Sequence, residues 1–355
     1  MKRLHWLTLG LLLTIFIAPA CAVELPLKGR WELKRVNRDL AGVVIDYTHN
    51  HGSDRRIWSN ALGQKRDLYV YLPPGFDPSK QYPLVIALHG YAQDERAFLR
   101  YAARDIDHAI ATGLLPPLII AVPDGSVDGD GCRVQAGSFF INSKAGRFED
   151  FVMQDVWDFV TANYPIRPER DAHVLFGVSM GGGSAFNLGI KYRDRVGVVA
   201  GLFPPLHMRY LDCHGRYMTK FDPDCQGLRT DLSHAHQTIG RLYHVIPVPL
   251  KRLLDPIYDR HDPTAADQLA RENPFEMIDM YDLREGELAM FIAYGGRDEF
   301  NIDAQVDSFL YKARHKGLTV DYVFDPKGHH DYATAQKLVP YLYDWIRPRL
   351  APFSP

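Results

Sequence analysis

The chain has 355 residues, of which 46% are hydrophobic and 12% aromatic, so it is long enough for one large domain or two small ones. With 41 basic and 43 acidic residues, its formal net charge is −2. This balance gives no indication of a nucleic acid or an anionic membrane surface as a partner.

The first residues have the composition of an export signal. Lys2 and Arg3 form a basic start, and the mostly apolar stretch 4–17 is followed by small residues. This order is typical of a secretory signal peptide, which is too short to span a bilayer stably. We therefore expect residues 1–20 to be removed and the protein to be periplasmic or secreted. Cys21 follows a small residue, so a lipid anchor at Cys21 is the alternative, and a membrane partner is expected in that case alone.

Three further cysteines follow, at Cys132, Cys213 and Cys225. In an oxidising compartment, Cys213 and Cys225 are plausible disulfide partners because they would close a short loop. The sequence does not determine the connectivity, and free buried thiols remain the alternative.

Apolar runs of strand length alternate with helical patterns through most of the chain. We expect strands at 43–47, 67–72, 83–88, 118–122, 174–176, 196–203, 288–294 and 319–324, and helices at 149–163, 305–315 and 338–346. The lead-in 24–62 is expected to hold one strand, and 123–131 to be a turn-rich surface loop. The alternation predicts a single α/β domain over 21–355, with a mostly parallel, doubly wound sheet covered on both faces.

Residues 205–285 interrupt this alternation. They contain two of the cysteines, several prolines and many His and Tyr residues. Their length and composition predict an inserted cap or lid over the carboxyl edge of the sheet, where it would shape substrate access. A surface excursion without function is the alternative. His234 and His236 form an H-x-H pair, which we interpret as solvated or partly buried histidines, and no metal site is predicted.

The stretch Gly177-Val178-Ser179-Met180-Gly181 connects an expected strand to a small-residue segment that indicates a helix. A serine on a sharp strand-to-helix turn is the nucleophile elbow of an α/β-hydrolase. The strained turn projects Ser179 Oγ clear of the sheet, and flanking side chains in place of glycine would collide across it. The backbone N–H of Met180, at a helix N-terminus, suits a developing oxyanion. Chance matches to so short a motif are common, so the strand before it and the helix after it decide whether the motif is a nucleophile elbow.

Three other loops complete the pattern. Tyr91 follows the expected strand 83–88, and its backbone N–H is the expected second oxyanion donor. Asp298 follows the strand 288–294 and is the expected acid, with Glu299 as the runner-up. The order Ser, Asp, His along the chain is that of the α/β-hydrolases. A histidine near its ordinary pKa of ~6.5 can take the serine proton and return it to the leaving group.

Adjacent histidines, His329 and His330, compete for the role of base, and a family resemblance distinguishes them. The blocks that carry it are LPPGFD at 72–77, LHG at 88–90, VPDG at 122–125, FEDF at 148–151, GVSMGG at 177–182 and GHHDY at 328–332. Together they resemble the esterase D family of α/β-hydrolases, which includes feruloyl, enterochelin-type and S-formylglutathione esterases. The resemblance covers roughly residues 60–350, apart from the inserted segment. In that family the catalytic histidine commonly stands two residues before an aromatic residue. Tyr332 matches that position and selects His330, with His329 as the alternative.

The resemblance implies hydrolysis of a carboxylic ester, in a small molecule or attached to a polymer, through an acyl-enzyme on Ser179 and without a cofactor. A serine peptidase or an acyltransferase on the same triad is an alternative, because the acyl-enzyme can form from an amide or be captured by another alcohol. A non-catalytic binding protein that keeps the α/β-hydrolase fold is an alternative of a different class. Neither the acyl group, the alcohol group nor the oligomeric state is predicted.

Overall fold

The computed structural model describes residues 26–129, 137–234, 236–242 and 246–355. The expected signal peptide, Cys21 and Cys132 lie outside the described residues.

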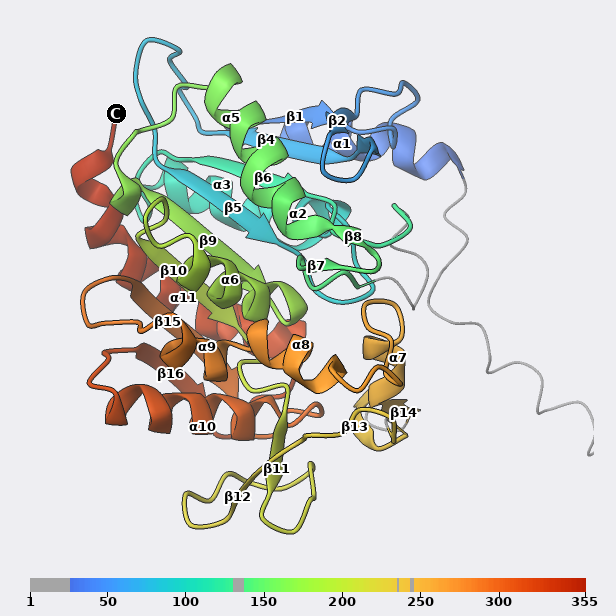
Figure 1. Cartoon of the computed structure of the whole chain (residues 1–355). Helices are drawn as coiled ribbons and strands as arrows, with labels where there is room; N and C mark the ends of the chain where they lie inside the picture. The colour runs from blue at the N-terminus through green and yellow to red at the C-terminus, as the bar shows by residue number, and fades with distance from the viewer. Residues whose placement is uncertain (1–25, 130–136, 235, 243–245) are drawn as a thin grey trace, which may run out of the picture.

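A sheet of eight strands forms the centre of the molecule, in the order β1-β4-β6-β5-β9-β10-β15-β16 (Figure 1). Its strands are β1 (Val43–Tyr47), β4 (Leu68–Leu72), β5 (Leu84–Leu88), β6 (Ile119–Pro123), β9 (His173–Val178), β10 (Val198–Leu202), β15 (Ala289–Gly295) and β16 (Asp321–Asp325). The neighbours from β6 through to β16 are parallel, whereas β4 is antiparallel to both β1 and β6. The prediction of a mostly parallel sheet is confirmed.

Strand β4 shows why the sheet has a core on each face. Leu68, Val70 and Leu72 belong to one cluster of buried residues, while Tyr69 and Tyr71 belong to a second. Successive side chains of a strand point to opposite faces, so a continuous apolar run needs cover on both sides.

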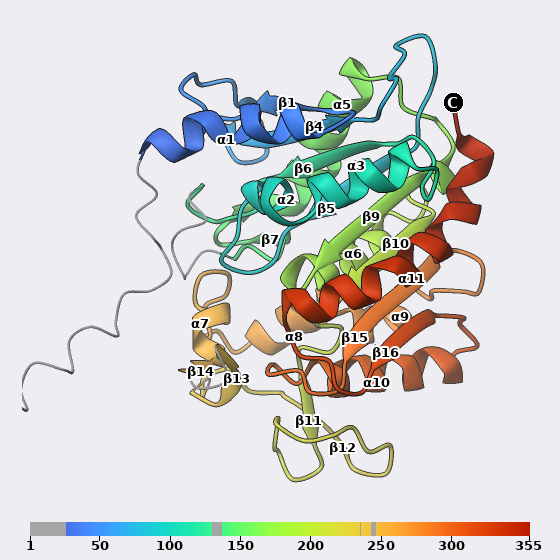
Figure 2. The same cartoon turned by 180° about the vertical axis from the view of Figure 1, so that it is seen from behind.

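Helices provide that cover. One face is covered by α1 (Pro26–Asp39), α2 (Arg96–Tyr101), α3 (Ala103–Ala111) and α11 (Tyr332–Leu350) (Figure 2). The opposite face is covered by α4 (Phe148–Asp150), a π-helical segment (Phe151–Val156), α5 (Trp157–Asn163), α6 (Met180–Lys191), α8 (Ala265–Arg271), α9 (Pro274–Met280) and α10 (Ile302–His315). Short 3₁₀ turns lie at Arg170–Ala172 and Ala351–Phe353. In the described part of the chain, no helix combines the length and the apolar character needed to cross a membrane.

Two expectations for connecting segments were wrong. The lead-in 24–62 contains α1 and the strand β2 (Ile57–Ser59), which pairs with β3 (Gln64–Arg66). Helix α1 has a weak apolar pattern, because it covers the sheet edge mainly through Leu33 and Val36. A sparse stripe of this kind is a poor helix signal in a sequence.

The loop after β6 was expected at the surface, but its described first part is buried. Asp124 and Ser126 are 1% and 0% exposed. The Arg66 guanidinium binds the Asp124 carboxylate at 2.8 Å and also donates to the carbonyl oxygens of Asp124 and Ser126. An ion pair between residues far apart in the sequence therefore keeps this loop buried. Such a pairing leaves no local sequence pattern from which it could be predicted.

The segment 205–285 has two structurally different parts. Helix α9 packs against α6 and α10 and so belongs to the helical layer on the sheet. Before it come the hairpin of β11 (Tyr210–Asp212) and β12 (Gln226–Leu228), the hairpin of β13 (Thr238–Leu242) and β14 (Ile246–Pro249), and α7 (Leu250–Leu254). Both hairpins and α7 extend beyond the sheet, as Figures 1 and 2 show.

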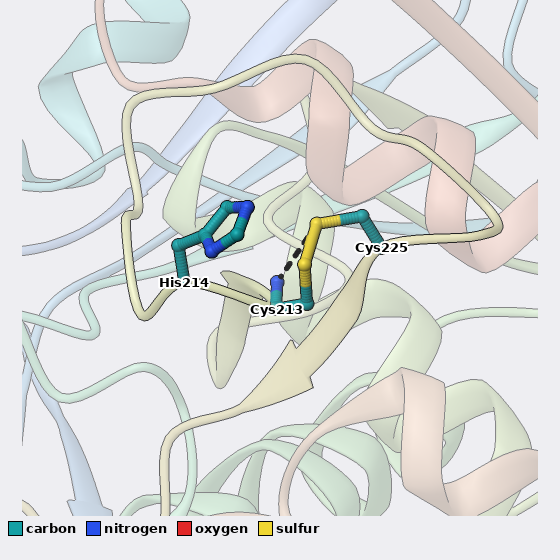
Figure 3. A group of neighbouring side chains, drawn as sticks. All are labelled: Cys213, His214 and Cys225. Atoms are coloured by element: carbon teal, nitrogen blue, oxygen red, sulfur yellow. Dashed lines mark hydrogen bonds between the residues drawn. A yellow bond between two sulfur atoms is a disulfide. The ribbon is translucent and has the colours of Figure 1, made fainter.

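Cys213 and Cys225 form a disulfide at the β11–β12 hairpin, as the short loop between them suggested (Figure 3). The N–H of Cys213 donates to the carbonyl oxygen of Cys225 at 3.2 Å, next to the bond. His214 lies beside them, but sulfurs joined in a disulfide are not the thiolates that bind metals. We therefore assign this group a structural role.

Candidate active site

The turn between β9 and α6 places Ser179 at the carboxyl edge of the sheet. Ser179 has φ 54° and ψ −119°, a strained backbone conformation for a residue with a side chain. A Cβ on Gly177 would lie 2.1 Å from the carbonyl oxygen of Gly181, and one on Gly181 would lie 2.1 Å from that of Leu88. The two glycines are therefore required by close backbone contacts, as the sequence motif predicts.

Ser179, His330 and Asp298 lie in one hydrogen-bonded line. The Oγ atom of Ser179 is 2.9 Å from Nε2 of His330, and Nδ1 of His330 is 2.7 Å from Oδ2 of Asp298. A carboxylate can only accept, so Nδ1 carries a proton, and Nε2 of a neutral ring is left to accept from the serine hydroxyl. The structure thus brings together three predicted residues from distant parts of the chain.

The loop after β15 holds the acid in place. The Asp298 side chain is 0% exposed, and its second oxygen, Oδ1, accepts the N–H of Phe300 at 2.8 Å. Burial lowers the pKa of His330, but the charge of Asp298 and its hydrogen bond outweigh burial, so the pKa lies above its ordinary value. The site therefore stabilises the imidazolium that forms when His330 takes a proton.

The two runner-up residues, Glu299 and His329, pair with each other. Nδ1 of His329 is 2.6 Å from Oε1 of Glu299. The other oxygen of Glu299 accepts the backbone N–H of His330 at 2.9 Å. Burial raises the pKa of Glu299, yet these hydrogen bonds outweigh burial and bring it below its ordinary value. Glu299 is therefore placed to position the His330 backbone, while Asp298 contacts the ring.

The turn that carries His330 is fixed by the start of α11. The side chain of Asp331 accepts the N–H of Thr334 at 2.8 Å and caps the helix. The Thr334 hydroxyl accepts the N–H of His329 at 2.9 Å. The residues on either side of His330, which are His329 and Asp331, are thus both hydrogen-bonded to Thr334 in the first turn of α11.

Tyr217, from the loop between β11 and β12, was not singled out in the sequence. Its hydroxyl donates to the carbonyl oxygen of Phe300 at 2.6 Å, and its own carbonyl oxygen accepts from Asn301 Nδ2 at 2.6 Å. Gln305 donates to the Tyr217 hydroxyl at 2.8 Å. The inserted segment therefore supports the loop that carries Asp298. A lone tyrosine among many in the segment gave no signal for this role.

The predicted oxyanion donors, Tyr91 and Met180, lie close together. A Cβ on Gly137 would meet the Tyr91 ring at 2.2 Å and the Met180 sulfur at 2.9 Å. Met180 is the first residue of α6, so its N–H lies at the positive end of that helix.

His89 fixes the start of the loop that carries Tyr91. Its Nδ1 donates to the carbonyl oxygen of Gly90 at 2.9 Å, and its Nε2 accepts the N–H of Gly125 at 2.9 Å. Nε2 can accept this hydrogen bond only when the ring is neutral. Burial lowers the pKa of His89 below its ordinary value, which keeps the ring neutral.

Another cluster with metal-ligand spacing among the described residues is Asp67, Glu95 and Asp124, which are all buried. Asp67 contacts His49 at 2.9 Å, and Asp124 contacts Arg66. Burial raises the pKa of Glu95 well above its ordinary value. The three acids are thus accounted for by pairing and protonation. His234, of the H-x-H pair, is exposed and contacts Asp231.

A cavity of about 970 Å³ is lined by Ser179, His330, Tyr91 and Met180. The inserted segment contributes Ile239, Val248 and Leu250 to its wall. The cavity therefore has room for a ligand next to the serine hydroxyl.

The fold and the Ser179 turn are those of the α/β-hydrolases, and comparison with known proteins gives the family. A model of the family described as "Putative esterase" matches residues 59–338, so the chain belongs to this family. A ferulic acid esterase superposes with a TM-score of 0.57 at 16% identity, covering 88% of this chain and 99% of that one. An S-formylglutathione hydrolase from Agrobacterium tumefaciens gives a TM-score of 0.59 at 16% identity, covering 88% and 96%. The expected α/β-hydrolase fold and esterase D resemblance are confirmed.

Curated relatives match shorter parts of the chain. Esterase Rv1288 of Mycobacterium tuberculosis is 28% identical over 157 residues, which is 42% of this chain and 32% of that protein. Endo-1,4-beta-xylanase Y of Acetivibrio thermocellus is 36% identical over 73 residues, which is 20% and 7%. The matches thus span a third or less of the length of these relatives.

Proposed function

We propose that this protein is a serine esterase that hydrolyses carboxylic esters through an acyl-enzyme on Ser179. The observation that carries the proposal is the line from Ser179 Oγ through His330 to Asp298, with contacts of 2.9 and 2.7 Å. Membership of the esterase family supports the same chemistry.

In the proposed mechanism each group has a defined role. Nε2 of His330 takes the hydroxyl proton as Ser179 Oγ bonds to the ester carbonyl carbon, and the carbonyl oxygen becomes an oxyanion. The N–H groups of Tyr91 and Met180 donate to that oxyanion. When the bond to the alcohol oxygen breaks, His330 returns the proton to the leaving alcohol. Water then attacks the acyl-enzyme by the same route, giving the acid and free Ser179.

Labelling with a fluorophosphonate probe tests the nucleophile. We expect the wild-type protein to be labelled at Ser179 and the Ser179→Ala variant to remain unlabelled. Ser79→Ala, which removes an exposed serine far from Ser179 in the sequence, is the matched control and should label like the wild type. Absence of label on the wild type would favour a binding protein that keeps the fold.

Comparison of ester and amide substrates separates the enzyme classes. The proposal predicts turnover of simple p-nitrophenyl esters, lost in Ser179→Ala, and little turnover of peptide p-nitroanilides. Faster cleavage of the anilides would instead identify a peptidase, and product esters formed with an added alcohol would identify an acyltransferase.

We propose further that the protein is exported. The basic and apolar order of residues 1–20 supports this, and so does the Cys213–Cys225 disulfide, because disulfides persist in oxidising compartments. Fractionation of cells, with mass spectrometry of the mature N-terminus, tests the proposal. A periplasmic or secreted protein that lacks residues 1–20 is expected. A cytosolic protein with the N-terminus intact would contradict it, and a lipid on Cys21 would show anchoring.

A further inference from the structure

The cavity over Ser179 continues well past the catalytic line. One part lies beneath β13–β14 and α7. A second part continues between the sheet and the two helices α3 and α11, and we call it the α3–α11 trough. Among the side chains that line this trough are Ala87, Ile106, Ala109, Phe176, Val339 and Leu342.

Exposure of the central strands shows that the trough is open. Ala87 of β5 and Phe176 of β9 lie side by side in register at the middle of the eight-stranded sheet. Both are partly exposed, although side chains at such positions are normally sealed by the covering helices. Two residues earlier on the same face, Val85 and Val174 are 8% and 1% exposed. The helix layer therefore separates from the sheet toward the carboxyl ends of the strands, where Ser179 lies.

The helices on either side of the opening present apolar side chains to it. Ile106 of α3 and Val339 of α11 both line the trough and are partly exposed. The polar lining residues that these helices contribute are mostly exposed at its rim, namely Asp105, His108, Gln336 and Asp344. Apart from Tyr343, the lining side chains of these helices that lie inside the rim are apolar, so a polar group there would lose its water with little to replace it, whereas burial of an aliphatic chain is favourable. The carboxylates of Asp105 and Asp344 at the rim also disfavour a chain that carries an acid at its far end, away from the ester group.

We propose that the preferred substrates are esters with a long aliphatic chain, whose tail occupies the α3–α11 trough while the ester group lies at Ser179. The proposal rests on the esterase function proposed above and specifies its substrate class. The chain can belong to the acyl or to the alcohol side of the ester, and the experiment below distinguishes these sources.

Turnover of a chain-length series tests the substrate class. The acyl arm compares p-nitrophenyl acetate, butanoate, octanoate and dodecanoate, and the alcohol arm compares ethyl, octyl and dodecyl acetate. In one arm, kcat/KM should rise by up to about fourfold for each added methylene, and by at least about tenfold over the series. The arm that rises shows which side of the ester enters the trough. No rise in either arm overturns the proposal.

A variant that fills the trough tests the location of the chain. Val339→Trp should lower the ratio of long-chain to acetyl kcat/KM by about tenfold or more. Lys337→Trp is the matched control: it puts the same side chain on α11 at a position whose side chain is 69% exposed and should leave the ratio unchanged. Equal ratios in the two variants would place the chain elsewhere and overturn the proposal.

Binding in the absence of turnover separates this proposal from the esterase function. The Ser179→Ala variant should bind the fluorescent fatty acid cis-parinarate saturably. Binding should weaken at least about tenfold when Val339→Trp is added, and should persist with Lys337→Trp. Acetyl ester turnover at Ser179 without such binding overturns the trough proposal but not the esterase. Binding in the trough without turnover of any ester supports the ligand class and overturns the proposed esterase.

Discussion

Asp298 and Glu299 are adjacent carboxylates with different partners. Asp298 contacts the ring of His330, whereas Glu299 binds the His330 backbone and the ring of His329. The difference follows from the loop after β15, which buries one side chain and leaves the other beside the turn before α11. We infer that Asp298 sets the proton on His330 and that Glu299 positions the residue.

Replacing Asp298 tests the first role. In Asp298→Asn the amide can donate to Nδ1, which favours the wrong tautomer for accepting the Ser179 proton. We expect kcat to fall by about 10³–10⁴-fold with little change in melting temperature. Steady-state kinetics on p-nitrophenyl butanoate measure the effect, with the exposed Asp282→Asn as the control. A loss of less than threefold would show that Asp298 is not the acid.

The pH profile tests the charge around His330. Its neutral form is the base, so kcat/KM should fall as the pH drops through the His330 pKa, which lies above the ordinary ~6.5. The negative charge of Glu299 contributes to the raised pKa. In Glu299→Gln the pKa should therefore fall, and the midpoint of the acidic limb should move to lower pH. A midpoint that stays in place or moves upward would contradict this account.

At the scale of elements, the Ser179 turn depends on how closely three segments approach one another. The carboxyl end of β5, the end of β9 and the first turn of α6 meet where Gly177 and Gly181 lie. Any side chain at these positions would separate the segments and displace the serine.

Gly181→Ala tests this requirement. Its Cβ would lie 2.1 Å from the carbonyl oxygen of Leu88, so we expect a loss of about 3 kcal/mol or more in the free energy of unfolding. Gly113→Ala is the control, because it has φ +77° but no atom within 4 Å, and should lose about 1–2 kcal/mol. Urea unfolding followed by circular dichroism measures both. We expect a clear difference between the two variants, and equal losses would argue against a close-contact requirement at Gly181.

The inserted segment contributes to the site through Tyr217. In Tyr217→Phe the hydrogen bond to the Phe300 carbonyl oxygen is lost while the ring remains. We expect kcat to fall about two- to tenfold, because the loop that holds Asp298 loses one anchor. Tyr322→Phe, at a half-exposed position of β16, should keep full activity. Unchanged kcat in Tyr217→Phe would mean that the loop is rigid without this bond.

At the scale of the whole molecule, the central layers could be read from the sequence. Runs such as 83–88 and 288–294 are continuous, apolar and bounded by turn residues, so the parallel sheet was predictable. The order of a serine, an acid and a histidine at strand ends predicted the catalytic line, and the family resemblance was needed to select His330 over His329. Local patterns were enough for these features because each strand and each helix is a short continuous segment of the chain.

Other features depend on residues that meet only in three dimensions. The Arg66 pairing that buries Asp124, the support from Tyr217 and the pairing of Glu299 with His329 leave no periodic signal. The α3–α11 trough depends on how far two helices stand from the sheet, which no single segment determines. For this reason the substrate class could not be predicted from the sequence and is inferred from the cavity.

Ester hydrolysis by this mechanism requires a covalent intermediate on Ser179, and trapping that intermediate tests the proposed function most directly. The protein would be mixed with p-nitrophenyl octanoate, quenched in acid within one turnover and digested with trypsin. Fragmentation should then locate the octanoyl mass on Ser179 within the peptide 171–191. An octanoyl group on another residue, or turnover that persists unchanged in Ser179→Ala, would contradict the proposed mechanism.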